Sequence, residues 1–368
     1  MIEKMRSLDE KLKSIVATPE IKRQDDALAE LMIQLQRGLE YYENQVALGN
    51  ITTDHSFKCL LNESKGKIND TVAVIRHAHD VPESFCVDNI ESWMLSSDDI
   101  VFDPSKTSTI LGCGGFGLVM KGMYYGREVA VKQFHEILAT DSADLEKCIA
   151  KEIKAWMTFS HEPYILTLYG VCTKVPTPIL VSELCQTNIR RYIRSNPAML
   201  LPMIYQFACG LATIHKAGII HRDLKGDNVL VTFQNTVAIA DFGLSRTAMS
   251  LEKTTIGSTG MGTLNWMSPE QYLRPRRATT KSDIWSFGMT VWEILCNDTP
   301  FRGCTRFEFE NEIFQSESDR PEKPQDLDSQ YEPLWTLMTN CWQLNPIARP
   351  SAVEIVEFVN IHYGCLLE

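Results

Sequence analysis

One short stretch constrains this chain more than any other. Residues 220–231 read I-H-R-D-L-K-G-D-N-V-L-V, a polar run between apolar residues. Within it, Asp223 could accept a proton from a hydroxyl group, Lys225 could contact a phosphate, and Asn228 could hold a divalent cation. None of these roles is compelling alone. The assignment depends on whether the other residues that such a site needs occur elsewhere in the chain, in the right order.

Composition and charge indicate a globular protein of more than one domain. At 368 residues the chain is long for a single core, and 44% of its residues are hydrophobic. The formal net charge is −11, whereas nucleic acid and anionic lipid attract clusters of Lys and Arg. We therefore expect no nucleic-acid partner.

The cysteines and the hydrophobic stretches indicate the cellular compartment of the protein. The 11 cysteines are scattered and form no C-x-x-C pair, which predicts reduced thiols without a disulfide framework or a zinc site. Charged residues interrupt every hydrophobic stretch before it reaches membrane length, and the first residues lack an apolar signal-peptide core. We expect a cytoplasmic protein with no transmembrane segment.

Apolar residues recur at helical spacing through residues 1–90. One stripe runs from Ile2 to Ile15 and a second from Leu28 to Val46, and two shorter helices are expected at residues 54–62 and 65–79. Helices of this kind must bury their stripes, so a small helical bundle is predicted. A structural cap and a regulatory or interaction module with its own protein partner both fit this pattern.

Residues 91–104 are expected to form a connector to the next domain. Trp93 is its predicted anchor, because an indole buries a large apolar area. A metal site at His77 and His79 is not expected, since residues two apart on a helix point to different faces.

A G-x-G-x-x-G pattern begins at Gly112 and ends at Gly117. A dinucleotide-binding fold would need a helix to start at the third glycine. The sequence beyond Gly117 instead predicts two strands, with turns at Gly122 and Gly126. This favours a glycine-rich hairpin that covers the phosphates of a nucleotide, because glycines let the backbone approach closely.

Lys132 ends the apolar run Val-Ala-Val-Lys. An ammonium group at the end of a buried strand needs a partner, because it loses hydration there. The favoured partner is Glu152, on a helix predicted over residues 142–159, and Glu136 and Glu146 are alternatives.

A second acidic group follows in the sequence Ala-Asp-Phe-Gly, where Asp241 is the acid. Magnesium prefers oxygen ligands and keeps several waters, so the carboxylate of Asp241 and the amide of Asn228 suit it. Residues 247–261 are rich in Ser, Thr and Gly and predict a mobile loop, which precedes the run M-S-P-E at residues 267–270. An ordinary loop that needs no modification is the alternative reading of this segment.

Two further charged residues have predicted structural roles. Asp283 begins a strongly apolar helix, from which its carboxylate could brace the backbone of residues 220–231. Arg349, in N-P-I-A-R-P-S, could pair with Glu270.

Taken in order, these motifs resemble those of the eukaryotic protein kinases over about residues 100–361. Residues 220–231 match the catalytic pattern H-R-D-L-x-x-x-N at every fixed position. Lys225 and Thr263 resemble the serine/threonine type, and W-M-S-P-E and G-V-C resemble the tyrosine-kinase-like group. Ser268 departs from the usual alanine of A-P-E.

The resemblance implies an α+β fold over residues 105–363, with a small β-rich lobe carrying one helix and a large, mostly helical lobe. It implies a serine/threonine kinase that uses ATP and Mg2+, acts on protein substrates, and is activated by phosphorylation of its loop through Arg222. The implied catalytic residues are Asp223, Lys225, Lys132, Glu152 and Thr263. The implied magnesium ligands are Asn228 and Asp241. The implied nucleotide-binding residues are Leu111, Gly112, Cys113, Gly114, Gly115, Phe116, Gly117, Val119, Ala130, Lys132, Glu183, Cys185 and Leu230.

Two alternatives stay open. A pseudokinase would use the same fold as a signalling scaffold, and loss of Lys132, Asp223 or Asp241 would have indicated it; all three are present. A dual-specificity or tyrosine kinase would differ in the acceptor hydroxyl group.

Overall fold

A computed structural model of the chain describes residues 2–18, 20–47, 55–79, 93–114, 117–134, 153, 156–172, 177–241, 261–274 and 278–366. It divides into two units, and each is described by itself. The first unit comprises Met1–Asp141 and Tyr169–Ser182, and the second comprises Ser142–Leu168 and Glu183–Glu368.

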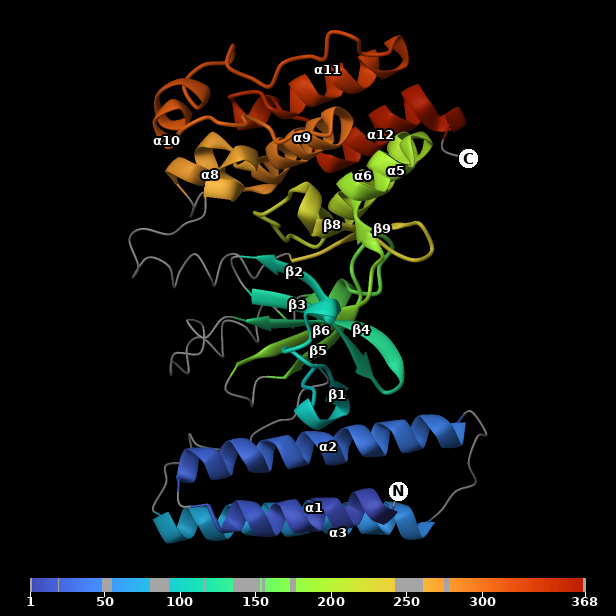
Figure 1. Ribbon diagram of the computed structural model, residues 1–368, viewed down its shortest axis with the longest axis vertical. Coiled ribbons are helices and arrows are strands. Elements are labelled where there is room, and N and C mark those ends of the chain that lie inside the picture. Colours follow the sequence, from blue (N-terminus) through green and yellow to red (C-terminus); the bar gives the residue numbers. More distant parts are fainter. Residues whose placement is uncertain are drawn as a thin grey trace. The chain divides into compact units, whose positions relative to one another are not determined.

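Three helices precede the sheet of the first unit (Figure 1): α1 Ile2–Val16, α2 Ile21–Ala47 and α3 His55–His79. Each packs against the other two. Their apolar stripes meet in one core, as the helical spacing predicts. The buried members of this core are Ile15, Leu28, Leu31, Met32, Leu35, Ile68, Val72 and Ile75.

The prediction of two short helices over residues 54–79 is wrong, because α3 runs through the expected break. Residues 62–65 contain neither glycine nor proline, so nothing there stops a helix. Lys67 Nζ also lies 3.2 Å from Glu63 Oε1, an i,i+4 pair that bridges the expected break.

A six-stranded sheet follows in the first unit, with the order β1-β3-β4-β6-β5 and with β2 paired to β3. Every pairing of β3 is antiparallel. The strands are β1 Ile100–Val101, β2 Ile110–Gly114, β3 Gly117–Tyr124, β4 Arg127–Phe134, β5 Leu168–Cys172 and β6 Ile179–Glu183.

The predicted turn at Gly126 is present, but the turn predicted at Gly122 is wrong. Tyr125 and Gly126 have φ angles of 47° and 76°, which suit a two-residue hairpin between β3 and β4. Gly122 lies inside β3, where an added Cβ would be 2.7 Å from Cγ2 of Val131. The glycine therefore permits close packing within the sheet rather than a change of direction.

The connector after residue 92 joins the sheet by its backbone. Leu95 N donates to Val171 O at 2.9 Å, and Val171 N donates to Trp93 O at 2.8 Å. Trp93 is buried, with 3% of its surface exposed. The connector thus lies along β5 at residues 93–95, and it continues into the short helix η1 Ser97–Asp99.

Polar side chains of α2 hold this connector. Arg37 Nη2 donates to Met94 O at 3.0 Å, and Gln34 Nε2 donates to Asp98 Oδ2 at 2.7 Å. The carboxylate of Glu30 accepts bonds from both the backbone amide and the hydroxyl of Ser97. The helical bundle is therefore hydrogen-bonded to the connector within the first unit.

The second unit is mostly helical (Figure 1) and carries a three-stranded sheet of order β7-β8-β9. Helices α6 and α9 form its centre, with nine and twelve buried residues respectively. The helices are α5 Ile189–Ser195, α6 Leu200–Lys216, α8 Pro269–Leu273, α9 Thr280–Cys296, α10 Arg306–Glu308, α11 Glu332–Cys341 and α12 Ala352–Tyr363. The strands are β7 Thr187–Asn188, β8 Val229–Val231 and β9 Val237–Ile239.

One helix of the described residues, 197–216, is long and apolar enough by length and composition to cross a membrane. It contains α6, which packs against α9 and α12. Because core helices of globular proteins pass the same criterion, this is weak evidence for a membrane span.

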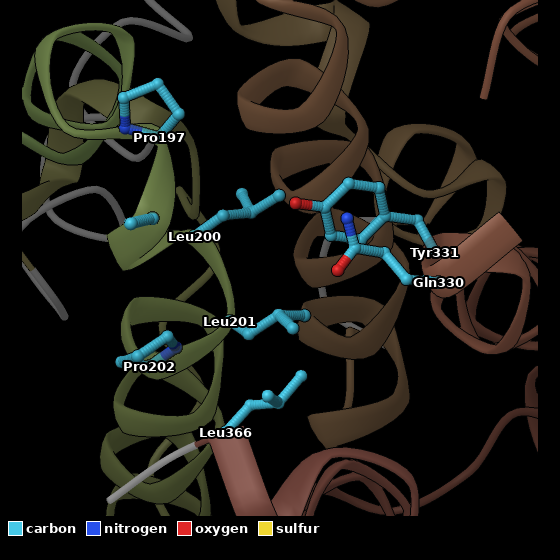
Figure 2. Close-up of a pocket in the computed structure, with 8 residues that line it drawn as sticks. Pro197, Leu200, Leu201, Pro202, Gln330, Tyr331 and Leu366 are labelled. Carbon is cyan, nitrogen blue, oxygen red and sulfur yellow. The ribbon is translucent and has the colours of Figure 1, made fainter. Parts of the chain in front are cut away.

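A surface pocket of about 340 Å³ lies at the start of α6 (Figure 2). Leu200 points toward Tyr331 across it. Its lining consists of Pro197, Ala198, Leu200, Leu201, Pro202, Gln330, Tyr331 and Leu366. None of the site residues predicted from the sequence lines this pocket.

Candidate active site

The stretch 220–231 connects α6 to β8, and a buried carboxylate in α9 fixes its backbone. Asp283 is fully buried, and its Oδ2 and Oδ1 accept the backbone amides of His221 and Arg222, each at 2.8 Å. Arg222 has a φ of +72°, a left-handed conformation that its carboxylate-bound amide helps to hold. The prediction that Asp283 braces this loop is confirmed.

The loop brings three of the predicted residues together. Asn228 Nδ2 donates to Asp223 Oδ2 at 2.9 Å and to Asp223 O at 2.7 Å. Lys225 Nζ lies 3.2 Å from Asp223 Oδ2. Asp223 is 4% exposed, so a carboxylate with fixed orientation sits beside a cation in a site largely shielded from water.

His221 has a role that the sequence reasoning did not assign. It is fully buried, and burial lowers the pKa of its imidazole, which favours the neutral ring. Its Nε2 lies 2.8 Å from Ala240 O and acts as the donor, while Nδ1 accepts the amide of Asp223 at 3.3 Å. The ring therefore joins the loop to the residue that precedes Asp241, and the match to H-R-D was the signal for it.

Asn228 and Asp241 are the two residues whose side-chain oxygens would hold magnesium. The Nδ2 group of Asn228 donates only toward Asp223, which turns its amide oxygen away from that carboxylate. The backbone beside Asp241 is joined to Asn228, since the amide of the preceding residue, Ala240, donates to Asn228 O at 2.8 Å. An amide oxygen and a carboxylate are the hard ligands that magnesium takes, so the residues fit the ion. Clusters of three or more His, Cys, Asp or Glu with metal-ligating geometry are absent from the described residues.

The segment after the predicted mobile loop is anchored by a buried ion pair. Arg349 Nη1 lies 2.6 Å from Glu270 Oε1, and Nη2 lies 3.0 Å from Oε2, a bidentate arrangement. Burial alone would raise the pKa of Glu270, but the bonds to Arg349 outweigh it and hold that pKa below its ordinary value. The predicted pairing of Arg349 with Glu270 is confirmed.

The same segment is joined to the loop once directly and once through Glu293 on α9. Gln271 Nε2 donates to Arg222 O at 2.7 Å. The indole of Trp266, in η6 Met261–Trp266, donates to Glu293 Oε2 at 2.8 Å, and that oxygen also accepts the amide of Gly226 at 2.9 Å. Glu293 was missed by the sequence reasoning, although a glutamate in the apolar run of α9 was a signal for a buried polar partner.

In the first unit, β2 and β3 form the predicted glycine-rich hairpin. Gly112 is paired with Val119, and Val119 is in turn paired with Lys132 on β4. An added Cβ at Gly117 would be 2.2 Å from Gln133 O, so only glycine fits there.

The remaining nucleotide-site predictions fall in both units. Lys132 on β4 is 7% exposed, with Nζ 5.9 Å from the ring centre of Phe134, and Ala130 lies on the same strand. In the second unit, burial raises the pKa of the Cys185 thiol to about 12, which keeps it protonated at neutral pH. Other predicted residues of this site are Leu111, Cys113 and Gly114 on β2, Glu183 at the end of β6, and Leu230 on β8.

Several predictions lie outside the described residues. They are Gly115, Phe116, most of the helix predicted over residues 142–159, the glutamates Glu136, Glu146 and Glu152, residues 247–260 of the predicted mobile loop, and the side chain of Thr263, whose backbone lies in η6. The pairing of Lys132 with Glu152 therefore stays a prediction.

The family model and the relatives that match this chain all carry kinase descriptions. Residues 105–359 match the family model described as protein tyrosine and serine/threonine kinase. A putative serine/threonine-protein kinase/receptor of Acanthamoeba polyphaga mimivirus is 31% identical over 278 residues, which are 74% of this chain and 16% of the relative. A probable serine/threonine-protein kinase of Dictyostelium discoideum is 32% identical over 272 residues, 72% of this chain and 29% of that protein.

A mitogen-activated protein kinase kinase kinase 12 of Rattus norvegicus is 30% identical over 256 residues, which are 68% of this chain and 27% of the relative. The chain thus spans less than a third of the length of each of these curated relatives.

Proposed function

Because the chain belongs to the protein tyrosine and serine/threonine kinase family, we propose that it transfers the γ-phosphoryl group of Mg-ATP to Ser or Thr hydroxyl groups of protein substrates. The observation that carries this proposal is the cluster of Asp223, Lys225 and Asn228, in which a buried carboxylate lies 3.2 Å from an ammonium group. The names of the relatives support Ser/Thr specificity, and one of them supports the tyrosine-kinase-like group.

Asp223 and Lys225, in the loop of residues 220–231, have different roles in this reaction. Asp223 orients the acceptor hydroxyl and takes its proton, because its carboxylate is held by Asn228. Lys225 neutralises negative charge beside the acceptor, where a phosphoryl group would pass. Positioning and charge supply most of the rate in phosphoryl transfer.

Asn228 and Asp241 would hold magnesium through an amide oxygen and a carboxylate. When bound, Mg-ATP supplies the phosphoryl group, and the ion neutralises the charge of its phosphates. The hairpin of β2 and β3 and the ammonium group of Lys132 on β4 would bind the phosphates. By the resemblance to the family, Leu111, Val119, Ala130, Leu230, Glu183 and Cys185 would be the adenine-binding residues.

Phosphorylation of the loop between Asp241 and Met261 would activate the enzyme. Arg222 is suited to meet such a phosphate, since Gln271 joins its backbone to the end of the same segment. The bond between Gln271 and Arg222 supports this coupling.

The helical bundle acts as a regulatory or docking module in our proposal, and its bonds from α2 to the connector favour a regulatory role. A cytoplasmic location is also proposed, because the described cysteines are free thiols.

The test is a transfer assay on the purified chain with γ-labelled ATP, magnesium and a generic protein substrate, followed by phosphoamino-acid analysis. Labelled phosphoserine or phosphothreonine is expected. ATP binding without transfer would favour the pseudokinase alternative, and abundant phosphotyrosine would overturn the proposed specificity.

A further inference from the structure

The polar junction between the helical bundle and the connector contains a serine hydroxyl that the proposed function does not use. Ser97 begins η1 and is half-buried. Its Oγ donates to Glu30 Oε1 at 2.9 Å, and its backbone amide donates to the same oxygen. Glu30 lies on α2, so one carboxylate oxygen of the bundle holds the start of η1.

The second carboxylate oxygen of Glu30 is not compensated. Oε2 is buried and has no hydrogen-bond partner among the residues that the structure describes. A buried oxygen without a donor costs free energy, which weakens the docked junction. The buried apolar clusters of the bundle and of the sheet also share no residue, so the polar contacts weigh heavily in this junction.

The sequence around Ser97 adds further negative charge to the junction. The two residues that follow it are Asp98 and Asp99, and Asp99 is buried. The hydroxyl of Ser97 itself contacts the carboxylate of Glu30. A new negative charge on Ser97 would therefore be placed directly against a carboxylate, with two more acidic residues next to it in the chain.

Lys11 and Arg37 are cations of the bundle that bond to the connector. Lys11 Nζ pairs with Asp98, and Arg37 Nη2 donates to Met94 O at 3.0 Å. Each side chain would have to give up this contact to bind a charge on Ser97. These cations therefore do not offset the repulsion between such a charge and Glu30 without loss of other bonds that hold the bundle.

We propose that Ser97 is a phosphorylation site, and that its modification releases the helical bundle from the connector. Transfer from ATP forms the bond between Ser97 Oγ and phosphorus, breaks the bond from phosphorus to the bridging oxygen of ADP, and releases the hydroxyl proton. The product has a charge of about −1.5 to −2 at pH 7. Its oxygens accept hydrogen bonds, so the present bond to Glu30 is replaced by repulsion between like charges.

The proposal gives the regulatory role of the bundle a covalent trigger. It does not require the chain to be its own kinase, because a second kinase can supply the enzyme. A kinase with a basic substrate cleft suits the site, since Asp98 and Asp99 follow the acceptor. The hydroxyl must first leave Glu30, so transfer captures a junction that has opened locally and prevents it from closing again.

The first measurement asks whether Ser97 accepts phosphate. The full chain is incubated with Mg-ATP and an acid-directed serine kinase, and its phosphates are mapped by mass spectrometry. Phosphate on Ser97 is expected, and its rate of formation should rise by about tenfold in Glu30→Ala, which frees the hydroxyl. Absence of phosphate on Ser97 in both chains would overturn the inference.

The second measurement asks whether the phosphate releases the bundle. A carbodiimide joins a lysine to a carboxylate only where the two are in contact, so the yield of the link between Lys11 and Asp98 reports docking. The chain with phosphoserine incorporated at position 97 is compared with the unmodified chain. The pair of Lys323 and Glu332, 2.7 Å apart in the second unit, serves as the internal standard.

Ser105 provides a matched control for the added charge. It is exposed, and its Oγ donates to Asp103 in its own turn at 2.6 Å. Phosphoserine incorporated at position 105 therefore adds the same charge to the first unit, beside a carboxylate that does not belong to the bundle. The yield of the link between Lys11 and Asp98 should stay within about twofold of the unmodified chain.

Phosphate on Ser97 should lower the yield of that link by about tenfold or more, with the internal standard unchanged. Glu30→Gln in the phosphorylated chain should restore most of the yield, since a carboxamide is uncharged and can donate to phosphate. Equal yields with and without phosphate on Ser97 would overturn the inference. A loss that Glu30→Gln does not restore, or that extends to the internal standard, would overturn it too, because repulsion at Glu30 is then not the cause.

Failure of the proposed function gives a different result. A wild-type chain that transfers no phosphate to a protein substrate counts against that function alone, because a separate enzyme supplies the phosphate on Ser97 in these measurements.

Discussion

Asn228 holds Asp223 by two bonds from a single amide group, at 2.9 Å to Oδ2 and at 2.7 Å to the backbone carbonyl. The proposed proton acceptor and a proposed magnesium ligand are thus one rigid pair. The bonds fix the carboxylate of Asp223 and direct the amide oxygen of Asn228 elsewhere. One residue therefore serves both the acceptor and the metal side of the site.

Replacement of Asn228 should affect both the catalytic rate and the magnesium requirement. Asn228→Ala removes the two bonds to Asp223 and an oxygen ligand, so we expect kcat to fall by at least about tenfold and the magnesium concentration for half-maximal activity to rise. A magnesium titration of activity measures both. A normal magnesium requirement in this variant would contradict the assignment of Asn228 as a ligand.

Arg349→Lys should destabilise the chain in a pH-dependent way. Lysine cannot make the bidentate pair with Glu270, and loss of that buried pair costs on the order of 1–3 kcal/mol of unfolding free energy at pH 7. Arg349 lowers the pKa of Glu270, so the stabilisation is present above the unfolded value of about 4.5 and is lost as pH falls through the folded value.

Denaturant unfolding of the wild type and Arg349→Lys at several pH values checks this. The difference in unfolding free energy should shrink below about pH 4.5. A difference that stays constant across this range would show that the pair does not carry the effect.

Glu293 should give the opposite pH dependence. Burial raises its pKa to about 7, while the amide of Gly226 and the indole of Trp266 lower it and Asp227 raises it further. The folded chain thus binds the proton more tightly than the unfolded chain, and the stability contributed by this group falls as pH rises from about 4.5 to about 7.

Glu293→Gln removes this titration. The unfolding free energy of the wild type relative to Glu293→Gln should therefore be higher at pH 5 than at pH 8, by on the order of 1–3 kcal/mol. Equal pH dependence of the two proteins would mean that the carboxylate is already ionised in the folded state at low pH.

The bonds from α2 should protect the connector. Arg37→Ala removes the donor to Met94 O, next to the amides by which Leu95 and Val171 join the connector to β5. We expect faster hydrogen exchange at these two amides. Lys67→Ala, which removes only a surface pair on α3, is the control and should leave both rates unchanged. Exchange rates at these amides that are the same in Arg37→Ala and the wild type would contradict a role for α2 in holding the connector.

Prediction from the sequence was most accurate where the signal is local. The glycine hairpin and the apolar stripes of the helical bundle follow from spacing and composition. The errors at Gly122 and at the break within α3 are also local. A glycine required for close packing looks like a turn glycine, and a polar run without glycine or proline looked like a loop.

Glu293 shows why the other contacts of the site could not be predicted from the sequence. Its two donors lie 67 and 27 residues away in the chain, and only the packing of α9 brings them to one oxygen. The partners of Asp283 and Arg349 were predicted because the motif order of a known family supplied that missing spatial information. The apolar run around Glu293 marks it as a buried polar residue but does not identify its donors.

The most direct test of the central claim compares two aspartates of the same loop. Asp223→Asn removes the proposed proton acceptor, whereas Asp227→Asn changes an exposed side chain that bonds to Asn188. Both variants and the wild type are assayed for phosphoryl transfer under identical conditions. Asp223→Asn should lose at least about 100-fold in kcat, and Asp227→Asn should stay near wild type. Equal transfer by Asp223→Asn and the wild type would contradict the account.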